Sequence, residues 1–160
     1  MRSTSWVALA AALFILATGM QLPPLVASHF DLAGHANAFM TRGKYLTLMV
    51  LVATGLPLAI GVSARWLATL PDNLINLPHK AYWLAPERRA RALAALTTHL
   101  ERFSWALAVF LCYLHWLIVR GQVRPAPRLA QGPFLAGLLV FLGFVVVWLV
   151  LLYRRFRRIP

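Results

Sequence analysis

The chain contains few charged residues and very few acidic ones. Only 12% of its 160 residues are charged, and four Asp and Glu stand against sixteen Lys and Arg. With 61% hydrophobic residues, this composition is far from that of a soluble domain and indicates an integral membrane protein. No pair of aspartates falls within an apolar run, which argues against an aspartyl intramembrane protease.

The sequence also lacks a second cysteine and a glycine-rich phosphate loop. Cys112 is the single cysteine, so no disulfide can form within the chain, and we expect a small buried apolar side chain there. The missing phosphate loop argues against an ATPase. The basic residues cluster at the ends of apolar runs, which fits lipid headgroups and topology better than nucleic acid, so we expect no nucleic-acid partner.

Four apolar segments are each long enough to cross about 30 Å of hydrocarbon as a helix. The first also resembles a secretory signal, but its apolar character continues to Leu22, which favours an uncleaved helix. We therefore predict an all-α, polytopic membrane protein with one membrane domain over residues 1–160. Its predicted spans are 6–22, 45–66, 103–119 and 134–153, with an outer loop at 23–44 and an inner segment at 67–102.

The distribution of basic residues predicts the orientation of these spans. With both termini in the cytoplasm, eleven Lys and Arg lie inside and five lie outside. The opposite orientation would invert this bias, against the tendency of basic residues to stay in the cytoplasm. We therefore expect the 23–44 loop and the 121–133 loop to lie outside.

The inner segment contains a predicted amphipathic helix that leads into the third span. Pro86 suits the first position of a helix, and no Gly or Pro interrupts residues 87–120, a length that exceeds one bilayer crossing. Leucines recur at helical spacing among basic positions. We expect this segment to bind anionic lipid headgroups or a protein partner through Tyr82, Trp83, Arg88, Arg89 and Arg91.

The outer loop gathers polar and turn-forming residues between two apolar runs, which makes it the candidate ligand site. If residues 26–31 are extended, His29 and Asp31 project from the same side and can pair. His115 lies about five residues from the outer end of the third span. The residues predicted to bind a ligand or to order this loop are His29, Asp31, His35, Asn37 and His115.

The three histidines of this set and Asp31 form a ligand set suited to zinc or another divalent metal. Their spacing matches no metal signature, so the favoured interpretation is a hydrogen-bonded cap in which His29 orders the loop, and we predict no cofactor. His115 is expected to make a hydrogen bond between helices. A metal-dependent membrane enzyme using His29, Asp31, His35 and His115 is the alternative function.

We assign no catalytic residue and lean against an enzyme. Ser28 and His29 are neighbours that would point to opposite faces of a strand, so a nucleophile with its base is not supported. On the second span, Gly55, Ala59 and Ser63 recur every four residues and form a face that another helix could approach closely. A further alternative is therefore an accessory subunit that binds a membrane-protein partner on this face.

Two stretches resemble a known family. Leu22-Pro23, Val26 and His29-Phe30 form an LPxxVxxHF-type motif, followed by Gly34 and Asn37, like that of a small four-span bacterial membrane family of unknown function. The same module occurs in Sdp-type toxin immunity and signalling proteins. Residues 76–89 resemble the companion motif, although His79 and Ala81 depart from its usual asparagine and acidic residue.

This resemblance implies a multi-pass protein of the bacterial cytoplasmic (inner) membrane. In the Sdp-type proteins the family role is protection against an exported peptide toxin, together with sequestration of a repressor at the membrane. Those proteins are larger, so that role comes to this chain by analogy. We expect a binding or sensing module whose partners are anionic lipid and a peptide or membrane protein.

Overall fold

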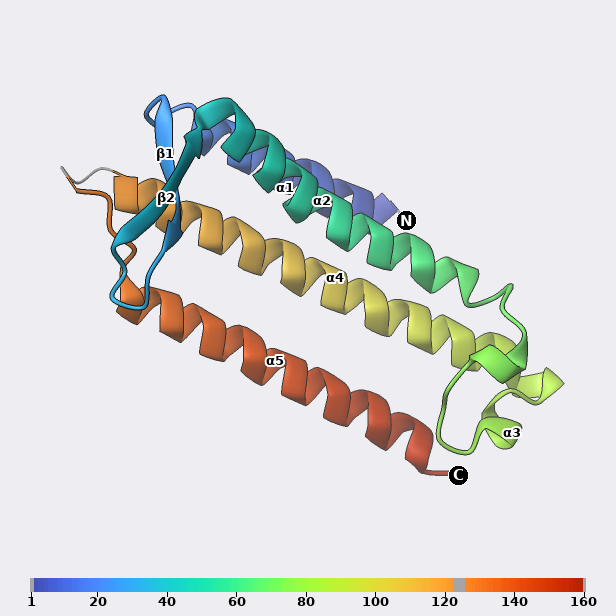
Figure 1. The fold of residues 1–160 in the computed structure, drawn as a ribbon. Coiled ribbons are helices and arrows are strands. Elements are labelled where there is room, and N and C mark those ends of the chain that lie inside the picture. Colours follow the sequence, from blue (N-terminus) through green and yellow to red (C-terminus); the bar gives the residue numbers. More distant parts are fainter. Residues whose placement is uncertain (1, 123–125, 160) are drawn as a thin grey trace.

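A computed structural model describes residues 2–122 and 126–159 as four long helices lying side by side, with a β-hairpin across one end (Figure 1). Residues 123–125 of the predicted 121–133 loop lie outside the described residues. The elements are α1 (Arg2–Gly19), β1 (Leu25–Phe30), β2 (Ala36–Thr41), α2 (Arg42–Trp66), η1 (Asp72–Leu74), α3 (Lys80–Trp83), α4 (Pro86–Gln122) and α5 (Gln131–Arg157).

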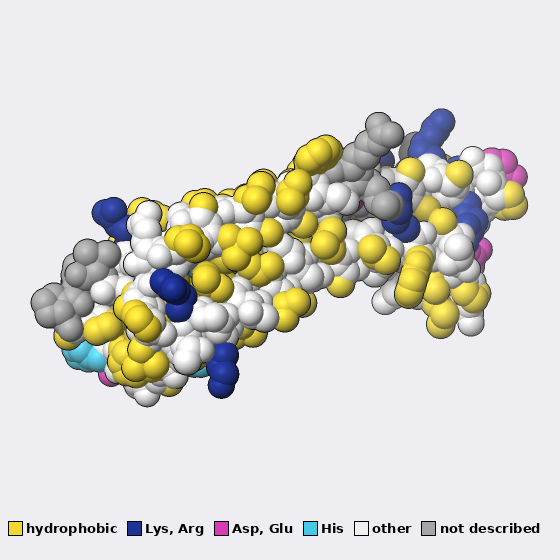
Figure 2. Space-filling model, turned by 90° about the horizontal axis from the view of Figure 1, so that it is seen from above, with side chains coloured by type: hydrophobic (Ala, Val, Ile, Leu, Met, Phe, Trp, Pro, Cys, Tyr) yellow, Lys and Arg dark blue, Asp and Glu magenta, His cyan; other side chains and the backbone are white. Residues whose placement is uncertain are grey.

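Three helices, α2, α4 and α5, are long and apolar enough to cross a membrane. The apolar part of α1, Ser3–Gly19, is shorter, so the first predicted span, 6–22, stays a prediction. On the face drawn in Figure 2, Lys and Arg side chains lie toward the two ends of the molecule and hydrophobic side chains cover the length between them. This distribution is typical of a protein that exposes an apolar belt to lipid.

Helices α1, α2 and α4 pack against one another, whereas α5 lies along α4. Small buried residues, Ala53 on α2 and Ala108 on α4, allow the close approach.

The small-residue face of α2 with Gly55, Ala59 and Ser63 is exposed in the described chain, and Gly55 faces open space. Gly61 faces α1 instead, where an added Cβ would lie 3.1 Å from Thr4 Cγ2. Binding of a membrane-protein partner on the exposed face with Gly55 stays a prediction.

The outer loop is a hairpin, which corrects the all-α expectation. β1 and β2 pair antiparallel, Leu25 with Thr41 at one end and Phe30 with Ala36 at the other. The turn between them contains Gly34 in a left-handed conformation with φ of 80°, which residues other than glycine adopt rarely. The predicted boundary with the second helix also shifts, because α2 begins at Arg42.

Helix α4 runs unbroken for 37 residues, as the absence of internal Pro predicts. The leucine face of its first part packs on protein, since Leu93 and Leu96 form a buried cluster with Ile75, Leu84 and Phe156. The segment before α4 and the end of α5 therefore cover these leucines. In Figure 1, the segments that carry this cluster lie at the end opposite the hairpin, beside the C-terminus.

Candidate functional site at the hairpin end

One face of the hairpin packs onto the ends of the bundle helices. Val26 is fully buried in a cluster with Leu22, Tyr45 and Val119, and Met40, which pairs with Val26 across the hairpin, packs against the same cluster. Because side chains alternate along a strand, the neighbours of these residues face away from the bundle. The hairpin therefore has a defined inner and outer face.

The edge of β1 is fixed to α4 by one side chain. Gln122 accepts a hydrogen bond from the Ala27 N–H at 3.0 Å through Oε1 and donates one to the Ala27 carbonyl at 3.1 Å through Nε2. The amide thus pairs with the strand as a neighbouring strand would. The last turn of α4 covers the free edge of β1 at this residue.

The turn of the hairpin is fixed to the chain that leads into α5. The Leu129 N–H donates to the Gly34 carbonyl at 2.9 Å, and Arg128 donates to the Ala33 carbonyl at 3.3 Å. Gln131 donates to the Leu32 carbonyl. His35 and Arg128 also form an isolated β-bridge. Since all of these bonds reach backbone carbonyls, or form a backbone bridge, they hold the shape of the turn.

At the other end of the hairpin, Arg42 closes the end of α1. Its guanidinium donates to the Leu22 carbonyl at 3.1 Å and to the Met20 carbonyl at 3.5 Å. A cation beside the carbonyl end of a helix is favourable both as a donor and against the helix dipole. The hairpin is therefore tied to the bundle at its edge, at its turn and at its base.

Asp31 and His35 come together in the turn. Asp31 Oδ1 accepts hydrogen bonds from the Ala33 N–H at 2.9 Å and the His35 N–H at 2.8 Å, and Oδ2 lies 3.5 Å from His35 Nδ1. The backbone hydrogen bond from His35 is the main reason why the pKa of the Asp31 carboxyl lies below its ordinary value. Both side chains are exposed, so they order the turn from its surface.

His29 does not join this pair. The strand register shifts between Ala27 and His29 and again between His29 and Phe30, so that His29 pairs with Ala38. Its Nδ1 lies 3.1 Å from Ser28 Oγ, closer than regular alternation along a strand would place two neighbouring side chains. The His29 side chain is exposed, and Val26 and Met40 pack against the bundle end. The predicted role of His29 in ordering the loop stays a prediction.

His115 is the polar centre of the bundle below the hairpin. It is fully buried, with Nε2 2.9 Å from Thr18 Oγ1 and Nδ1 2.9 Å from the Tyr45 hydroxyl. The Tyr45 ring stacks on it at 5.6 Å and the Phe14 ring meets it edge-on at 6.2 Å. This confirms the predicted hydrogen bond between helices and adds Thr18 and Tyr45, which sequence reasoning missed.

The predicted residues thus separate into three places. Asp31 pairs with His35 in the turn, His29 lies by Ser28, and His115 is enclosed between α1, α2 and α4. Within residues 2–122 and 126–159, no three His, Cys, Asp or Glu side chains come together as a metal site would require. The metal alternative stays a prediction without support from this geometry.

The residues predicted to dock on lipid at the opposite end make bonds within the chain. Trp83 Nε1 donates to the Phe156 carbonyl at 2.8 Å, and Arg88 donates to the Tyr82 carbonyl at 2.8 Å and lies over the Tyr82 ring. Arg89 forms an ion pair with Asp72 at 3.0 Å. Arg91 is exposed and lines a cleft. Their lipid role stays a prediction, but four of the five help to hold this end together.

The outer face of the hairpin is exposed and mixed in character. Asn37, Phe39 and Thr41 alternate outward along β2, and Leu25 lies beside Thr41 on the same face. Phe39 is 49% and Leu25 57% exposed. Leu32, at the tip of the turn, is 99% exposed. The predicted ligand residue Asn37 is thus placed on a face with large apolar side chains.

The free edge of β2 is a second feature of this face. Ala27 uses both of its backbone groups on Gln122, away from β2, and it pairs with Phe39. In an antiparallel ladder both members of such a pair point their backbone groups away from each other. The Phe39 N–H and C=O therefore point to the outer edge, where no other described backbone group pairs with them.

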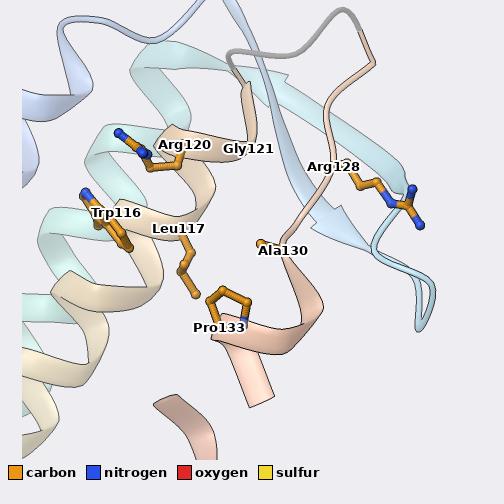
Figure 3. A pocket seen from close by; sticks show the side chains of 7 residues that line it. All are labelled: Trp116, Leu117, Arg120, Gly121, Arg128, Ala130 and Pro133. Carbon is orange, nitrogen blue, oxygen red and sulfur yellow. The ribbon is translucent and has the colours of Figure 1, made fainter. Parts of the chain in front are cut away.

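A cleft of about 550 Å³ lies next to the hairpin, between the end of α4 and the start of α5. In Figure 3, Leu117 of α4 and Pro133 of α5 point toward one another across it, while Arg128 points away toward the hairpin turn. Arg120 lies with its guanidinium 5.5 Å from the Trp116 ring. The two arginines that line this cleft are thus directed to the Trp116 ring and to the hairpin turn.

Comparisons with known proteins do not assign the chain to a family. No family model matches it, and neither does any curated protein or solved structure. The fold and the arrangement of residues therefore define a class only, a helical protein with three helices able to cross a membrane and a hairpin fixed across one end.

Proposed function

We propose that this is a four-span protein of the bacterial cytoplasmic membrane that binds an extended peptide on the free edge of β2, outside the cell membrane. The observation that carries the proposal is the open backbone of Phe39 in a hairpin that is tied to the bundle at its edge, turn and base. Exposed strand edges are templates for pairing with another chain.

The hairpin suits strand addition because it is already ordered. Gln122 and the Gly34 contact hold it without a partner, so a peptide would lose little affinity to the ordering of its receptor. In this mode main-chain hydrogen bonds supply affinity and alternate side chains supply specificity. Phe39 and Leu25 offer apolar contacts, and Asn37 offers an amide that can donate and accept.

Binding is favoured over catalysis because polar side chains near the hairpin are engaged in hydrogen bonds within the chain. His115 is enclosed and hydrogen bonded through both ring nitrogens, and Asp31 is engaged by the turn and does not orient His29. Asp31 thus does not serve as the third group that would orient His29 as a catalytic base beside Ser28. By the resemblance to Sdp-type proteins, we propose toxin immunity or signalling as the role of the binding.

A photo-crosslinking amino acid at Asn37, introduced in the native host, tests this function. We expect a peptide adduct by mass spectrometry, because Asn37 lies two residues from the open backbone of Phe39 on the same outer face. The same crosslinker at Leu48, which is 47% exposed on α2, should give lipid adducts. Lipid adducts alone at both positions would contradict peptide binding.

Two substitutions of Phe39 separate the backbone from the side chain. Phe39→Pro removes the N–H that points to the free edge and none of the bonds to β1, so the hairpin should persist while the peptide adduct is lost. Phe39→Ala keeps the N–H and should only reduce the adduct. A peptide adduct that survives Phe39→Pro would rule out strand addition at this edge.

A further inference from the structure

The basic residues at the end opposite the hairpin include two groups that differ in their contacts. Arg88 and Arg89 donate to carbonyls and to Asp72 within the chain. Arg91, Arg102 and Arg155 instead line one cleft of about 300 Å³ between α4 and α5. The second group therefore places three arginines from two helices around one cleft.

The walls of this cleft are held in place by a reciprocal contact. His99 Nε2 lies 2.9 Å from the Trp148 carbonyl, and Trp148 Nε1 donates to the His99 carbonyl at 2.9 Å. The two rings stack at 4.5 Å, and Phe103 packs on Trp148 at 5.1 Å. Since His99 itself lines the cleft, its contacts with Trp148 fix one wall of the site.

The charges of the cleft favour an anion. Among the described residues that line it, three carry positive charge and none is Asp or Glu. Like charges brought together raise the free energy of the empty site, and a bound anion lowers it. The planar fork of arginine also matches phosphate oxygens in pairs.

The position of the cleft along α4 and α5 matches the level of the lipid headgroups. Arg102 directly precedes Phe103, where the predicted third span begins, and Arg155 follows Tyr153, where the predicted fourth span ends. A phosphate held here would lie at the membrane surface, with its acyl chains beside the apolar side chains of α4 and α5.

We infer that this cleft binds the phosphate of an anionic phospholipid. The hairpin end provides a contrast on the same pair of helices, because Arg120 lies on Trp116 and Arg128 points toward the hairpin (Figure 3). Among the described residues, the two arginines that line the cleft there are directed apart. Phospholipid binding at the basic cleft is independent of peptide binding at β2 and can be tested separately.

Native mass spectrometry of the detergent-purified protein with added phosphatidylglycerol tests the site. We expect retained lipid on the wild type and weaker binding by about 30-fold in Arg102→Gln/Arg155→Gln, which is about 2 kcal/mol for two basic residues. The matched control is Arg154→Gln/Arg158→Gln, which removes the same charge from the same end of the chain, at a separate hollow lined by Arg154, Arg157 and Arg158. The control should bind as the wild type does.

Lysine variants and competition with inorganic phosphate test the site further. Arg102→Lys/Arg155→Lys preserves the charge without the planar fork and should bind with intermediate affinity, with the melting temperature of wild type. Equal loss in the cleft and control variants would show general charge attraction and overturn the site. Full displacement of the lipid by millimolar inorganic phosphate would also overturn it, in favour of a free-phosphate site.

Discussion

The Tyr45 hydroxyl donates a hydrogen bond to Nδ1 of His115, at 2.9 Å, across 70 residues of sequence. The direction follows from Thr18, whose hydroxyl donates to the Phe14 carbonyl at 2.7 Å and so accepts from Nε2 of the imidazole. A neutral histidine with its proton on Nε2 has only an acceptor at Nδ1. Three helices are thus linked in one chain of hydrogen bonds, from α2 through α4 to α1.

Tyr45→Phe should destabilise the bundle by about 1 kcal/mol, because Nδ1 of His115 loses its donor where no water can replace it. Unfolding of the purified protein in detergent measures the effect. Tyr153→Phe is the control, since Tyr153 is exposed on α5 and its ring is retained. If both variants have the same free energy of unfolding as the wild type, the hydrogen bond to His115 does not stabilise the fold.

The sequence predicted this histidine but not its partners. An ionisable residue within an apolar run is expected to bond to another helix. Which residue it meets depends on how each helix is rotated, and the partners lie 70 and 97 residues away. A single sequence shows which residues are apolar, but it does not fix these rotations.

The sequence predicted an outer loop where the structure has a hairpin. Pro23-Pro24 and Gly34 indicate turns, and the polar residues between them are typical of a loop. The alternation of Asn37, Phe39 and Thr41 was the available signal for a strand. The arginines after Pro86 were predicted to bind lipid headgroups. A sequence does not show which backbone carbonyls lie near an arginine, such as the two to which Arg89 donates.

Gly34→Ala should loosen the hairpin. A Cβ at this position would lie 2.5 Å from the Leu129 carbonyl oxygen, and φ is 80° there, so both the contact and the backbone conformation oppose a side chain. We expect faster amide hydrogen exchange over residues 25–41. Gly43→Ala, which meets nothing within 4 Å, is the control. Unchanged exchange in Gly34→Ala would mean that the turn does not depend on this contact.

The turn should also respond to pH through Asp31. Its folded pKa lies below the ordinary value of 3.8, chiefly because the ionised carboxylate accepts the His35 backbone N–H. The stabilisation is therefore present above about pH 4 and is lost as the pH falls through the folded pKa. Amide NMR shifts of Ala33 and His35 measured from pH 6 to pH 2 should report this transition, and Asp31→Asn should abolish it. A midpoint above 3.8 would contradict the prediction.

Single cysteines test the orientation, in a background where Cys112 is replaced. The excess of basic residues at the end opposite the hairpin predicts that this end lies in the cytoplasm. A membrane-impermeant maleimide should label Asn37→Cys, which is exposed on β2, in intact spheroplasts. Thr69→Cys, exposed at the opposite end, should react only after lysis. The reverse pattern would invert the topology and place the peptide edge inside the cell.

The packing of α5 on α4 depends on Gly137. A Cβ there would collide with the ring of Tyr113, whose hydroxyl donates to the Pro133 carbonyl at 2.6 Å. Gly137→Ala must displace the ring, which breaks this bond or separates the helices, so we expect a loss of about 1–3 kcal/mol in stability.

The matched control for this last substitution is Gly143→Ala on the same helix, where an added Cβ meets nothing within 4 Å. It should leave stability unchanged or raise it slightly, because alanine favours a helix more than glycine does. Hydrogen exchange over residues 131–157 and unfolding in detergent distinguish the two variants. If Gly137→Ala matches Gly143→Ala in both measurements, α5 does not rest on Tyr113 as the contact implies.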